Sequence, residues 1–453
     1  MEENLTPQRP IALIDLEFDL GRFYVIDARD DGSSHLLSSS SFSYKKANEK
    51  GNIYFDPAAI VEKSIFSLKK ALYEHPDIAE VLILGAGEVI LTMAGDEIVS
   101  LPYLEDSRLT PQLIRELNLQ CSLPLRYEIS GFNADIQSAI YRLYADYKQK
   151  KLLAADKFFF LPEYLYWALT KEEAHDIFLA ASGGFLDARH RDYSKAIING
   201  ASLPTGLFKD LKEPCQAQAL TCRDVSLALR KSLRVRLAGD SIVSAFRAEK
   251  SLADTLYLYQ GSISFLGALT RGPALDDSSR RLGFNNFFLP EGGALVMRLK
   301  PLTILSKLPA KRLQSLDDIG EGARNANYFE TFDPYDPVFA EAEDLEAAVK
   351  RHFLDKGMTP PQDEDEVTAA ILYSCAEALI KQIAHFEGAT GVTWRRLRLN
   401  GLFPPCRFLQ QRLAAVLGKK VSRSEENRNA MGAIAALREA ERKEKEESER
   451  VNE

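Results

Sequence analysis

An aspartate that follows an apolar segment is the clearest candidate for chemistry in this sequence. Residues 235–238 are apolar except for Arg236, Gly239 interrupts them, and Asp240 and Ser241 precede residues that favour a helix. This order predicts a strand-to-helix turn, where backbone N–H groups favour an anionic group. A carboxylate placed there could take the proton of a hydroxyl as a general base. Aspartate and serine are also preferred N-cap residues, so a purely structural cap is the alternative.

A second candidate lies near the N-terminus, where IALIDLEFDLGRFYVID predicts two antiparallel strands. Asp15 and the pair Gly21–Arg22 have residue types that suit a hairpin in contact with phosphate. Glu17 and Phe18 do not suit it, because they add negative charge and bulk at the turn. Two interpretations remain open: a phosphate loop that has been filled, or a hairpin that never held a phosphate.

Three weaker candidates accompany these. The strand QGSISFLG offers Gly261 and Ser262, small residues that would let a phosphate approach the backbone, although a strand that simply begins at a turn is the alternative. The stretch LRLNGLFPP has Gly401 followed by prolines, which cannot form a nest of backbone donors. Arg108, in the sequence DSR, could bind an anion or polar ligand, or this stretch could simply cap the next helix.

Composition excludes several classes of function. The net charge of −8 argues against a general nucleic-acid binder, which needs a basic surface. The five cysteines form no CxxC pair, no zinc site is visible, and reduced thiols in a cytoplasmic protein are expected. The polar, acidic first residues do not resemble a signal peptide, and the apolar stretch 78–95 is too short and charged to span a bilayer. We therefore expect a small-molecule ligand rather than nucleic acid or membrane.

The elements that must position these residues alternate along the chain. Residues 11–105 predict strands and turns around one helix at 56–75, and residues 107–250 are mainly helical, with one helix at 132–150. Strands return from 254, helices follow at 338–385, and 393–401 predicts a buried strand. This order predicts two α/β domains with a cleft between them. The last residues are almost wholly charged and predict a solvated, fraying helix.

In their order and spacing, several segments resemble the FGGY carbohydrate kinases, and among them the rhamnulokinase branch. The resemblance runs from about residue 11 to about 436 and rests on these segments: YLEDSR (103–108), ISGFNADIQSAIYRLYA (129–145), FFFLPEYLYWALT (158–170), AASGGFLD (180–187), GDSIVSA (239–245), YLYQGSISFLG (257–267) and FDPYDPVF (332–339). It implies an α/β fold of two actin-like ATPase (ribonuclease H-like) domains, residues 8–248 on the sugar side and 249–437 on the nucleotide side, with a charged tail at 438–453.

The resemblance also implies an activity and residue roles. The reaction would be transfer of the ATP γ-phosphate to a sugar hydroxyl, with Mg²⁺ and with Asp240 as the base. Asp15 would organise the metal through water. Arg108 and Asn133 would contact the sugar, and a ketose such as L-rhamnulose is implied. The nucleotide would be bound by Asp15, Gly21, Arg22, Gly261, Ser262 and Gly401.

The sequence departs from the family at several of these places. Glu17 replaces a glycine of the family hairpin, and Asp19 adds a second negative charge. Two unit charges at about 4 Å in an effective dielectric of about 20 interact by roughly 4 kcal/mol, which would disfavour ATP unless a metal offsets it. Leu84 and Val89 replace the acidic residues expected for sugar contacts, and NGLFPP replaces a glycine run.

These departures leave three hypotheses. The first is an active carbohydrate kinase. The second is a non-catalytic FGGY-like pseudokinase that binds sugar or regulates a partner. The third is an unrelated α/β protein.

Overall fold

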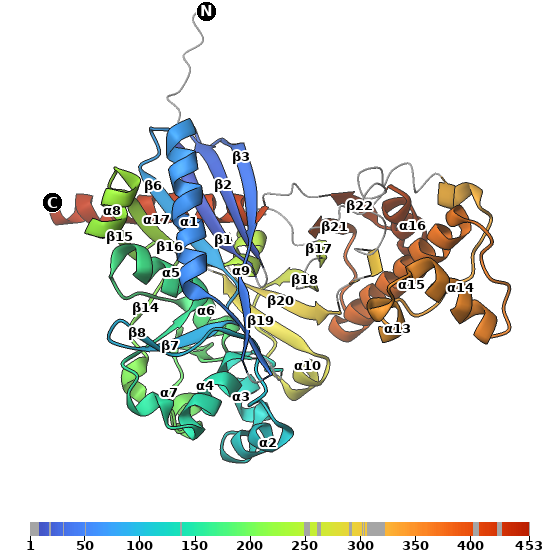
Figure 1. The fold of residues 1–453 in the computed structure, drawn as a ribbon, viewed down its shortest axis with the longest axis horizontal. Helices are drawn as coiled ribbons and strands as arrows, with labels where there is room; N and C mark the ends of the chain where they lie inside the picture. The colour runs from blue at the N-terminus through green and yellow to red at the C-terminus, as the bar shows by residue number, and fades with distance from the viewer. Residues whose placement is uncertain are drawn as a thin grey trace, which may run out of the picture. The chain divides into compact units, whose positions relative to one another are not determined.

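Tertiary contacts divide the chain into two compact units (Figure 1). In the computed structural model the first unit comprises Met1–Ser251, Thr270–Ala294 and Asn427–Glu453, and the second comprises Leu252–Leu269 and Leu295–Glu426. The structure describes residues 9–17, 20–29, 31–49, 51–135, 138–248, 254–260, 264–289, 292–300, 302, 304–305, 322–401, 407–423 and 428–452.

A six-stranded sheet forms the centre of the first unit, in the order β15-β16-β6-β1-β2-β3. Its strands are β1 (Pro10–Leu16), β2 (Leu20–Ala28), β3 (Ser34–Ser43), β6 (Glu80–Gly85), β15 (Gln218–Leu220) and β16 (Arg234–Asp240). Strands β1, β6 and β16 are parallel, whereas β2, β3 and β15 are antiparallel to their neighbours. The predicted N-terminal hairpin is confirmed as β1–β2, with Leu16 opposite Gly21.

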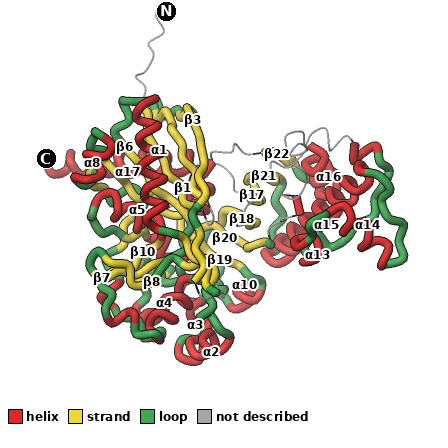
Figure 2. The backbone as a smooth tube through the Cα atoms, viewed as in Figure 1, coloured by secondary structure: helices red, strands yellow, loops and turns green. Residues whose placement is uncertain are grey.

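Both faces of this sheet are buried at its central strands, because apolar side chains alternate along these strands between two clusters. On β1, Ala12, Ile14 and Leu16 belong to one cluster, and Ile11 and Leu13 belong to the other. Near-continuous apolar strands of this kind are typical of sheets covered by helices on both sides. Figure 2 shows the strands in yellow among the red helices.

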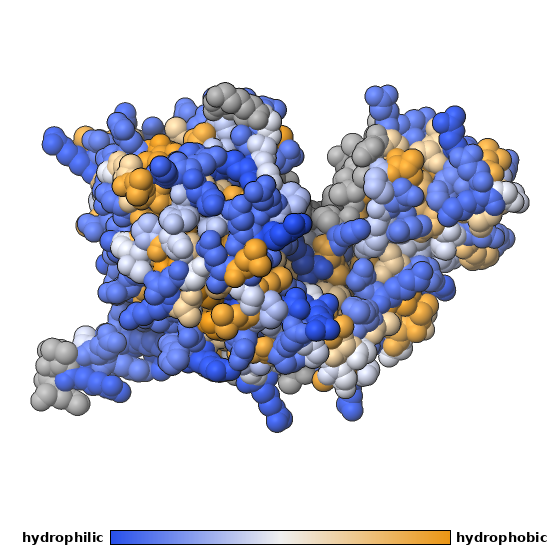
Figure 3. All heavy atoms as spheres, turned by 90° about the horizontal axis from the view of Figure 1, so that it is seen from below, coloured by the Kyte–Doolittle hydropathy of each residue, from blue (hydrophilic) through white to orange (hydrophobic). Residues whose placement is uncertain are grey.

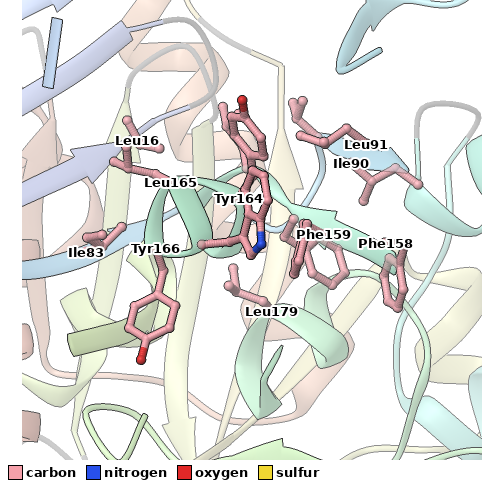
Figure 4. Close-up of a cluster of buried hydrophobic side chains, with 14 of the residues drawn as sticks. Leu16, Ile83, Ile90, Leu91, Phe158, Phe159, Tyr164, Leu165, Tyr166 and Leu179 are labelled. Carbon is pink, nitrogen blue, oxygen red and sulfur yellow. The ribbon is translucent and has the colours of Figure 1, made fainter. Parts of the chain in front are cut away.

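The helices α1 (Pro57–Glu74), α5 (Leu161–Thr170) and α6 (Ile177–Ser182) cover the face that carries the first cluster. The predicted helix at 56–75 is confirmed as α1, and Asp56 caps it by accepting the N–H of Ala59 at 3.1 Å. Figure 4 shows part of this cluster, where side chains of β1, β6, β10, α5 and α6 meet. This core fixes the position of α6 against the end of the sheet.

The other face of the sheet is covered by α17 (Arg428–Asn452) and α9 (Ser241–Arg247). Figure 1 shows α17, in red, beside the blue N-terminal strands. Six apolar side chains of α17 are buried in the second cluster, those of Ala430, Ala433, Ile434, Ala436, Leu437 and Ala440. The last helix of the chain therefore completes the core of the first unit.

The remaining elements of the first unit surround the sheet. Two of them form a hairpin in which Ala94 pairs with Glu97. The predicted helix at 132–150 begins only at Ala139, so Asn133 lies before it. The elements of the first unit that surround the sheet are β4 (Lys46–Glu49), β5 (Asn52–Phe55), β7 (Ile90–Ala94), β8 (Glu97–Ser100), β9 (Tyr103–Glu105), α2 (Pro111–Gln120), α3 (Leu123–Ser130), α4 (Ala139–Lys148), β10 (Lys157–Phe160), β11 (His175–Asp176), β12 (Leu186–Asp187), β13 (Asp192–Tyr193), α7 (Lys195–Gly200), β14 (Leu211–Lys212), α8 (Arg223–Leu229), α10 (Asp277–Arg281) and β19 (Phe284–Leu289).

The second unit repeats the core pattern of the first. Its strands β17 (Thr255–Gln260), β18 (Ser264–Thr270), β20 (Gly292–Leu299), β21 (Arg396–Gly401) and β22 (Lys420–Arg423) follow the order β20-β18-β17-β21-β22. An antiparallel hairpin, β17–β18, is again followed by two parallel strands, β21 and β22. Its helices are α13 (Pro337–Glu341), α14 (Leu345–Asp355), α15 (Glu364–Thr390) and α16 (Arg407–Leu417).

Helix α15 is long and apolar enough to cross a membrane by composition alone, but 67% of its most apolar window is buried inside the protein. It contacts α14 and α16, as a core helix does. Exposed apolar side chains of the first unit include Phe66 and Tyr73 on α1 and Leu119 on α2. On the face in Figure 3, hydrophobic residues form small groups among hydrophilic ones, which is ordinary for a globular protein.

The predicted domain boundaries need correction. Residues 270–294 and 427–453 group with the first unit rather than with a C-terminal domain and a separate tail. The charged end of the chain is anchored, because Arg9 forms ion pairs with Glu80 at 2.9 Å and Glu441 at 2.5 Å. Glu444 is 2.7 Å from the buried guanidinium of Arg236. These ion pairs anchor the charged helix as far as Glu444, whereas residues 445–450 are exposed.

Candidate active site

Three adjacent parallel strands of the first unit end at one edge of the sheet. Leu16 of β1 and Asp240 of β16 both pair with Gly85 of β6, and Asp15 pairs with Leu84. In open α/β sheets, ligands bind beyond the carboxyl ends of the strands. The register therefore brings the two predicted carboxylates, on β1 and β16, to the edge where a site is expected.

Asp240 lies at the predicted strand-to-helix turn, because β16 ends at it and α9 begins at Ser241. Its Oδ1 atom accepts the N–H groups of Ile242 at 2.8 Å and Val243 at 3.1 Å, so it is the N-cap of α9. Its Oδ2 atom accepts the hydroxyl of Ser182 at 2.8 Å. Burial raises the pKa of Asp240 to about 6, and Glu88 adds to the rise. The cap geometry and a pKa suited to a general base therefore occur in the same residue.

A second buried aspartate, which sequence reasoning missed, lies beside this turn. Asp176 caps α6 by accepting the N–H groups of Phe178 at 2.8 Å and Leu179 at 3.1 Å. Gly239 has a φ of 95°, and a Cβ atom there would lie 2.9 Å from both carboxylate oxygens of Asp176. The glycine thus lets β16 pass this carboxylate. A polar residue directly before the apolar run 177–181 was the available signal.

Asp15 is fully buried and bonded to two uncharged partners. The hydroxyl of Ser241 donates to its Oδ1 atom at 2.5 Å, and the side-chain amide of Asn429 donates to its Oδ2 atom at 3.1 Å. Burial raises the pKa of Asp15, and these hydrogen bonds oppose the rise. Asn429 comes from α17, so no local signal in the sequence linked it to Asp15.

In the hairpin β1–β2, the arginine that was predicted to face phosphate forms an ion pair with Glu17, a residue that does not suit a phosphate loop. The Nε atom of Arg22 lies 2.8 Å from Oε1 of Glu17, and both side chains are largely buried. A Cβ atom on Gly21 would lie 2.2 Å from the ring of Phe42, so that glycine makes room for an aromatic side chain of β3. The cation that was predicted to face phosphate is thus paired with a carboxylate, and both interpretations of the hairpin stay predictions.

The two residues predicted to contact sugar are engaged in the structure. The guanidinium of Arg108 bonds to Asp106 at 2.6 Å and to Asp146, and it lies 4.5 Å from the centre of the Tyr103 ring. Burial lowers the pKa of Arg108, but these carboxylates raise it above the ordinary value. Asn133 donates its side-chain amide to the carbonyl of Arg280 at 2.7 Å. Both positions remain predictions as sugar contacts.

Leu84 and Val89, which stand where the family has acidic residues, are buried in the core of the first unit. Leu84 belongs to the cluster under α17, and Val89 belongs to the cluster under α1 and α5. Glu88, between them in the sequence, is half-buried and raises the pKa of Asp240. Of the nucleotide residues predicted in the second unit, Gly401 ends β21 opposite Gln260, whereas Gly261 and Ser262 lie outside the described residues.

A buried histidine supports the segment that leads into Asp176. His175 is 1% exposed and lies 3.4 Å from a carboxylate oxygen of Glu163 and 3.3 Å from one of Glu173. Glu163 also accepts the N–H of Asp176 at 2.9 Å. Burial lowers the pKa of His175, but the two carboxylates outweigh it and raise the pKa to about 9. At neutral pH this imidazolium helps to hold the start of α6.

We expect the first unit to lose stability as the pH rises above neutrality, because His175 then loses its positive charge. Its pKa is 6.5 in the unfolded chain and about 9 in the folded one, so its stabilisation is complete below pH 6.5 and is lost as the pH rises through about 9. The loss should be about 3 kcal/mol. Urea unfolding across this range should show a slope that His175→Gln removes and that His190→Gln, at an exposed histidine, leaves in place. An unchanged slope in His175→Gln would contradict this assignment.

The chemistry of the donor groups at the sheet edge is compatible with magnesium. Among the described residues no three His, Cys, Asp or Glu side chains group closely enough to hold a metal ion. Mg²⁺, however, prefers carboxylate oxygens and keeps several of its waters. The single buried carboxylate of Asp15, acting through a water, suits that kind of site.

Comparisons with known proteins agree with this fold. No family model matches the chain. The rhamnulokinase of Halalkalibacterium halodurans is 23% identical over 320 residues, which cover 68% of each chain. That of Bacteroides thetaiotaomicron is 23% identical over 383 residues, or 80% of this chain and 76% of the relative. The structure of a gluconate kinase from Lactobacillus acidophilus matches with a TM-score of 0.75 at 14% identity, over 96% of this chain and 89% of the other.

A Plasmodium falciparum glycerol kinase solved with ADP matches with a TM-score of 0.73 at 14% identity, over 95% of this chain and 89% of the other. The fold is therefore that of the two-domain, actin-like sugar kinases, which confirms the predicted fold class. In sequence the chain resembles the FGGY carbohydrate kinases, and rhamnulokinase in particular, as its ordered segments predicted.

Proposed function

We propose that this protein is an ATP-dependent carbohydrate kinase in which Asp240 is the general base. The observation that carries the proposal is Asp240 itself. It ends a parallel strand at the ligand-binding edge of the sheet, its Oδ1 atom is fixed by two backbone N–H groups, and its pKa is about 6. A carboxylate with these properties is ionised at neutral pH and basic enough to accept a proton. The resemblance to rhamnulokinases supplies the class of reaction.

The proposed reaction moves one proton to Asp240 and one phosphoryl group to the sugar. A sugar hydroxyl gives its proton to Oδ2 of Asp240 as its oxygen forms a bond to the γ-phosphorus, and the bond between that phosphorus and ADP breaks. ATP supplies the phosphoryl group, and Mg²⁺ would offset the charge of its phosphates. The residues of this chain position the base through the hydrogen bonds to Asp240. Asp15, which is held by Ser241 and Asn429, would accept from a water bound to the metal.

The substrate we propose is a ketose, by likeness to the rhamnulokinases. The usual acidic contacts are replaced by buried Leu84 and Val89. Arg108 and Asn133 stay our candidates for sugar contacts, and each would have to exchange a present partner for the sugar. We also propose that the protein acts in the cytoplasm.

A non-catalytic sugar-binding protein is the second candidate function. The observation that favours it is the ion pair between Glu17 and Arg22, which neutralises the arginine of the hairpin and adds a carboxylate beside it. Such a protein would keep the fold and bind sugar without turning ATP over. The two candidates differ in one measurable property, which is sugar-dependent consumption of ATP.

Replacing Glu17 with glutamine is expected to lower the KM for ATP by about tenfold, because it removes a negative charge from the hairpin and releases Arg22 toward phosphate. Steady-state kinetics with varied Mg-ATP would measure this. Glu97→Gln, at an exposed position on β8, is the matched control and should leave KM unchanged. An unchanged KM in Glu17→Gln would mean that the hairpin does not face the phosphates.

The proposal is tested by ADP release from Mg-ATP across a panel of ketoses, aldoses and polyols. A kinase releases ADP faster in the presence of its sugar, and the panel then names the class of sugar. If the folded protein releases no ADP above background with any sugar while a sugar raises its melting temperature, the kinase proposal is wrong and the second candidate stands.

A further inference from the structure

Ser182, the last residue of α6, connects that helix to the proposed base. Its hydroxyl is buried and lies within hydrogen-bonding distance of two acceptors, Oδ2 of Asp240 at 2.8 Å and the carbonyl oxygen of Phe178 at 3.0 Å. A serine hydroxyl carries one proton, so it can donate to only one of these acceptors at a time. The geometry therefore gives the hydroxyl two alternative orientations.

The two oxygens of Asp240 have different surroundings. Oδ1 accepts hydrogen bonds from two backbone N–H groups of α9. These N–H groups could not accept a hydrogen bond from a proton on Oδ1. Oδ2 has the hydroxyl of Ser182, which can both donate and accept. Oδ2 is therefore the oxygen on which a proton can be held with a hydrogen bond in place.

We infer that Ser182 is a positioning residue that serves Asp240 in both of its protonation states. When Asp240 is ionised, Ser182 donates to Oδ2. When Oδ2 holds the proton, the carboxylic acid donates to Ser182, and the hydroxyl of Ser182 turns to the carbonyl of Phe178. This inference deepens the proposed function and rests on it, because Asp240 needs both states in each catalytic cycle.

The surroundings of Ser182 support a fixed position for it. Asp176 caps the start of the helix that ends with Ser182, and Gly183 at the helix end donates its N–H to Leu179 at 2.9 Å. A Cβ atom on Gly87 would lie 2.6 Å from the Cβ atom of Ser182, so the loop after β6 packs directly against it. The hydroxyl is therefore held from two sides.

Several charged groups lie near the same turn. Glu88 comes from the loop after β6, Asp15 from β1 through its bond to Ser241, and Asp176 from the start of α6 beside Gly239. Among these groups, Glu88 raises the pKa of Asp240. The neutral donor at Oδ2 opposes that rise, because the contact with Ser182 lowers the pKa of Asp240.

Ser182→Ala is expected to move the acidic limb of the pH profile of kcat/KM upward by about one pH unit. Activity should fall about tenfold well below the pKa of Asp240 and stay near the wild-type value above about pH 8. Ser64→Ala is the matched control, because Ser64 is a buried helical serine that bonds the carbonyl of Ile60 at 2.8 Å in the same way. It should not move the limb. Equal losses at every pH in Ser182→Ala would show a merely structural role and overturn the inference.

A second readout does not depend on turnover. Carbon-13 NMR of labelled aspartate carboxyl groups should show one group that titrates near pH 6 and disappears in Asp240→Asn. In Ser182→Ala that group should titrate about one unit higher. If the wild type turns over no sugar but this shift appears, the proposed function fails and the contact between Ser182 and Asp240 stands. If turnover is present but the titration does not move, the inference about Ser182 fails alone.

Discussion

Asp240→Asn should reduce sugar-dependent ADP release by about a thousandfold or more. General-base catalysis contributes about 10²–10⁴ to such reactions, and an amide cannot take up the proton of the sugar hydroxyl. The rate with each active sugar would be compared with that of the wild type at saturating Mg-ATP. Because Asp240 is the one residue that carries the proposed chemistry, this is the largest effect that we expect on activity.

The same substitution should leave the fold intact. An asparagine oxygen can still accept the N–H groups of Ile242 and Val243, and asparagine ranks with aspartate as an N-cap. Asp56→Asn is the matched control, because Asp56 caps α1 without lying at the sheet edge, and it should keep full activity. Substantial turnover in Asp240→Asn would show that the base is another group. Loss of activity in both variants would indicate that damage to helix caps, not loss of a base, is responsible.

Gly432→Ala should produce the largest loss of stability. Gly432 lies where α17 crosses α9, and a Cβ atom there would be 1.7 Å from the carbonyl oxygen of Ser244. That contact is with backbone, so no side-chain rotation relieves it and the two helices must separate. Overpacking of this kind costs about 1–3 kcal/mol, and more where backbone must move.

The separation should also reach the site, since Asn429, which bonds Asp15, lies one turn before Gly432 on the same helix. We expect a lower midpoint of thermal unfolding and reduced activity together. Gly388→Ala is the matched control, because Gly388 lies in α15 with nothing within 4 Å of its Cβ position. It should be neutral or stabilising by up to about 1 kcal/mol. A Gly432→Ala protein as stable as the wild type would contradict the packing of α17 on α9.

Local signals predicted the parts of the site that local sequence determines. The hairpin β1–β2 follows from two apolar runs around a turn, and the helix cap at Asp240 follows from a glycine and an aspartate after an apolar strand. Helix α1 follows from Asp56 before Pro57 and a helical apolar spacing. In each case the residues that decide the structure are neighbours in the chain.

Partners that are distant in sequence could not be predicted in this way. Ser182 bonds Asp240, and Asn429 bonds Asp15, only because strands and helices far apart in the chain meet at one sheet edge. Arg22 was expected to face phosphate, but its pairing with Glu17 depends on the register of the hairpin. Each of these contacts needs a tertiary structure before it can be seen.

The charged end of the chain also has distant partners that its own sequence does not predict. Its composition is typical of a solvated helix, and only the alanine-rich start carries an apolar face. Its carboxylates nevertheless pair with Arg9 and with the buried Arg236. Arg9 precedes β1 at the opposite end of the sequence, and Arg236 lies on β16 in its middle. Charge patterning alone could therefore not identify them as partners.

Direct detection of the phosphorylated sugar would test the central claim. The protein would be incubated with Mg-ATP that carries a labelled γ-phosphate and with each sugar that accelerates ADP release or binds to the protein. Mass spectrometry would then follow the label. We predict that the label appears on one class of sugar in the wild type and is absent with Asp240→Asn. If a sugar binds the folded protein and no label reaches it, the protein is not a carbohydrate kinase.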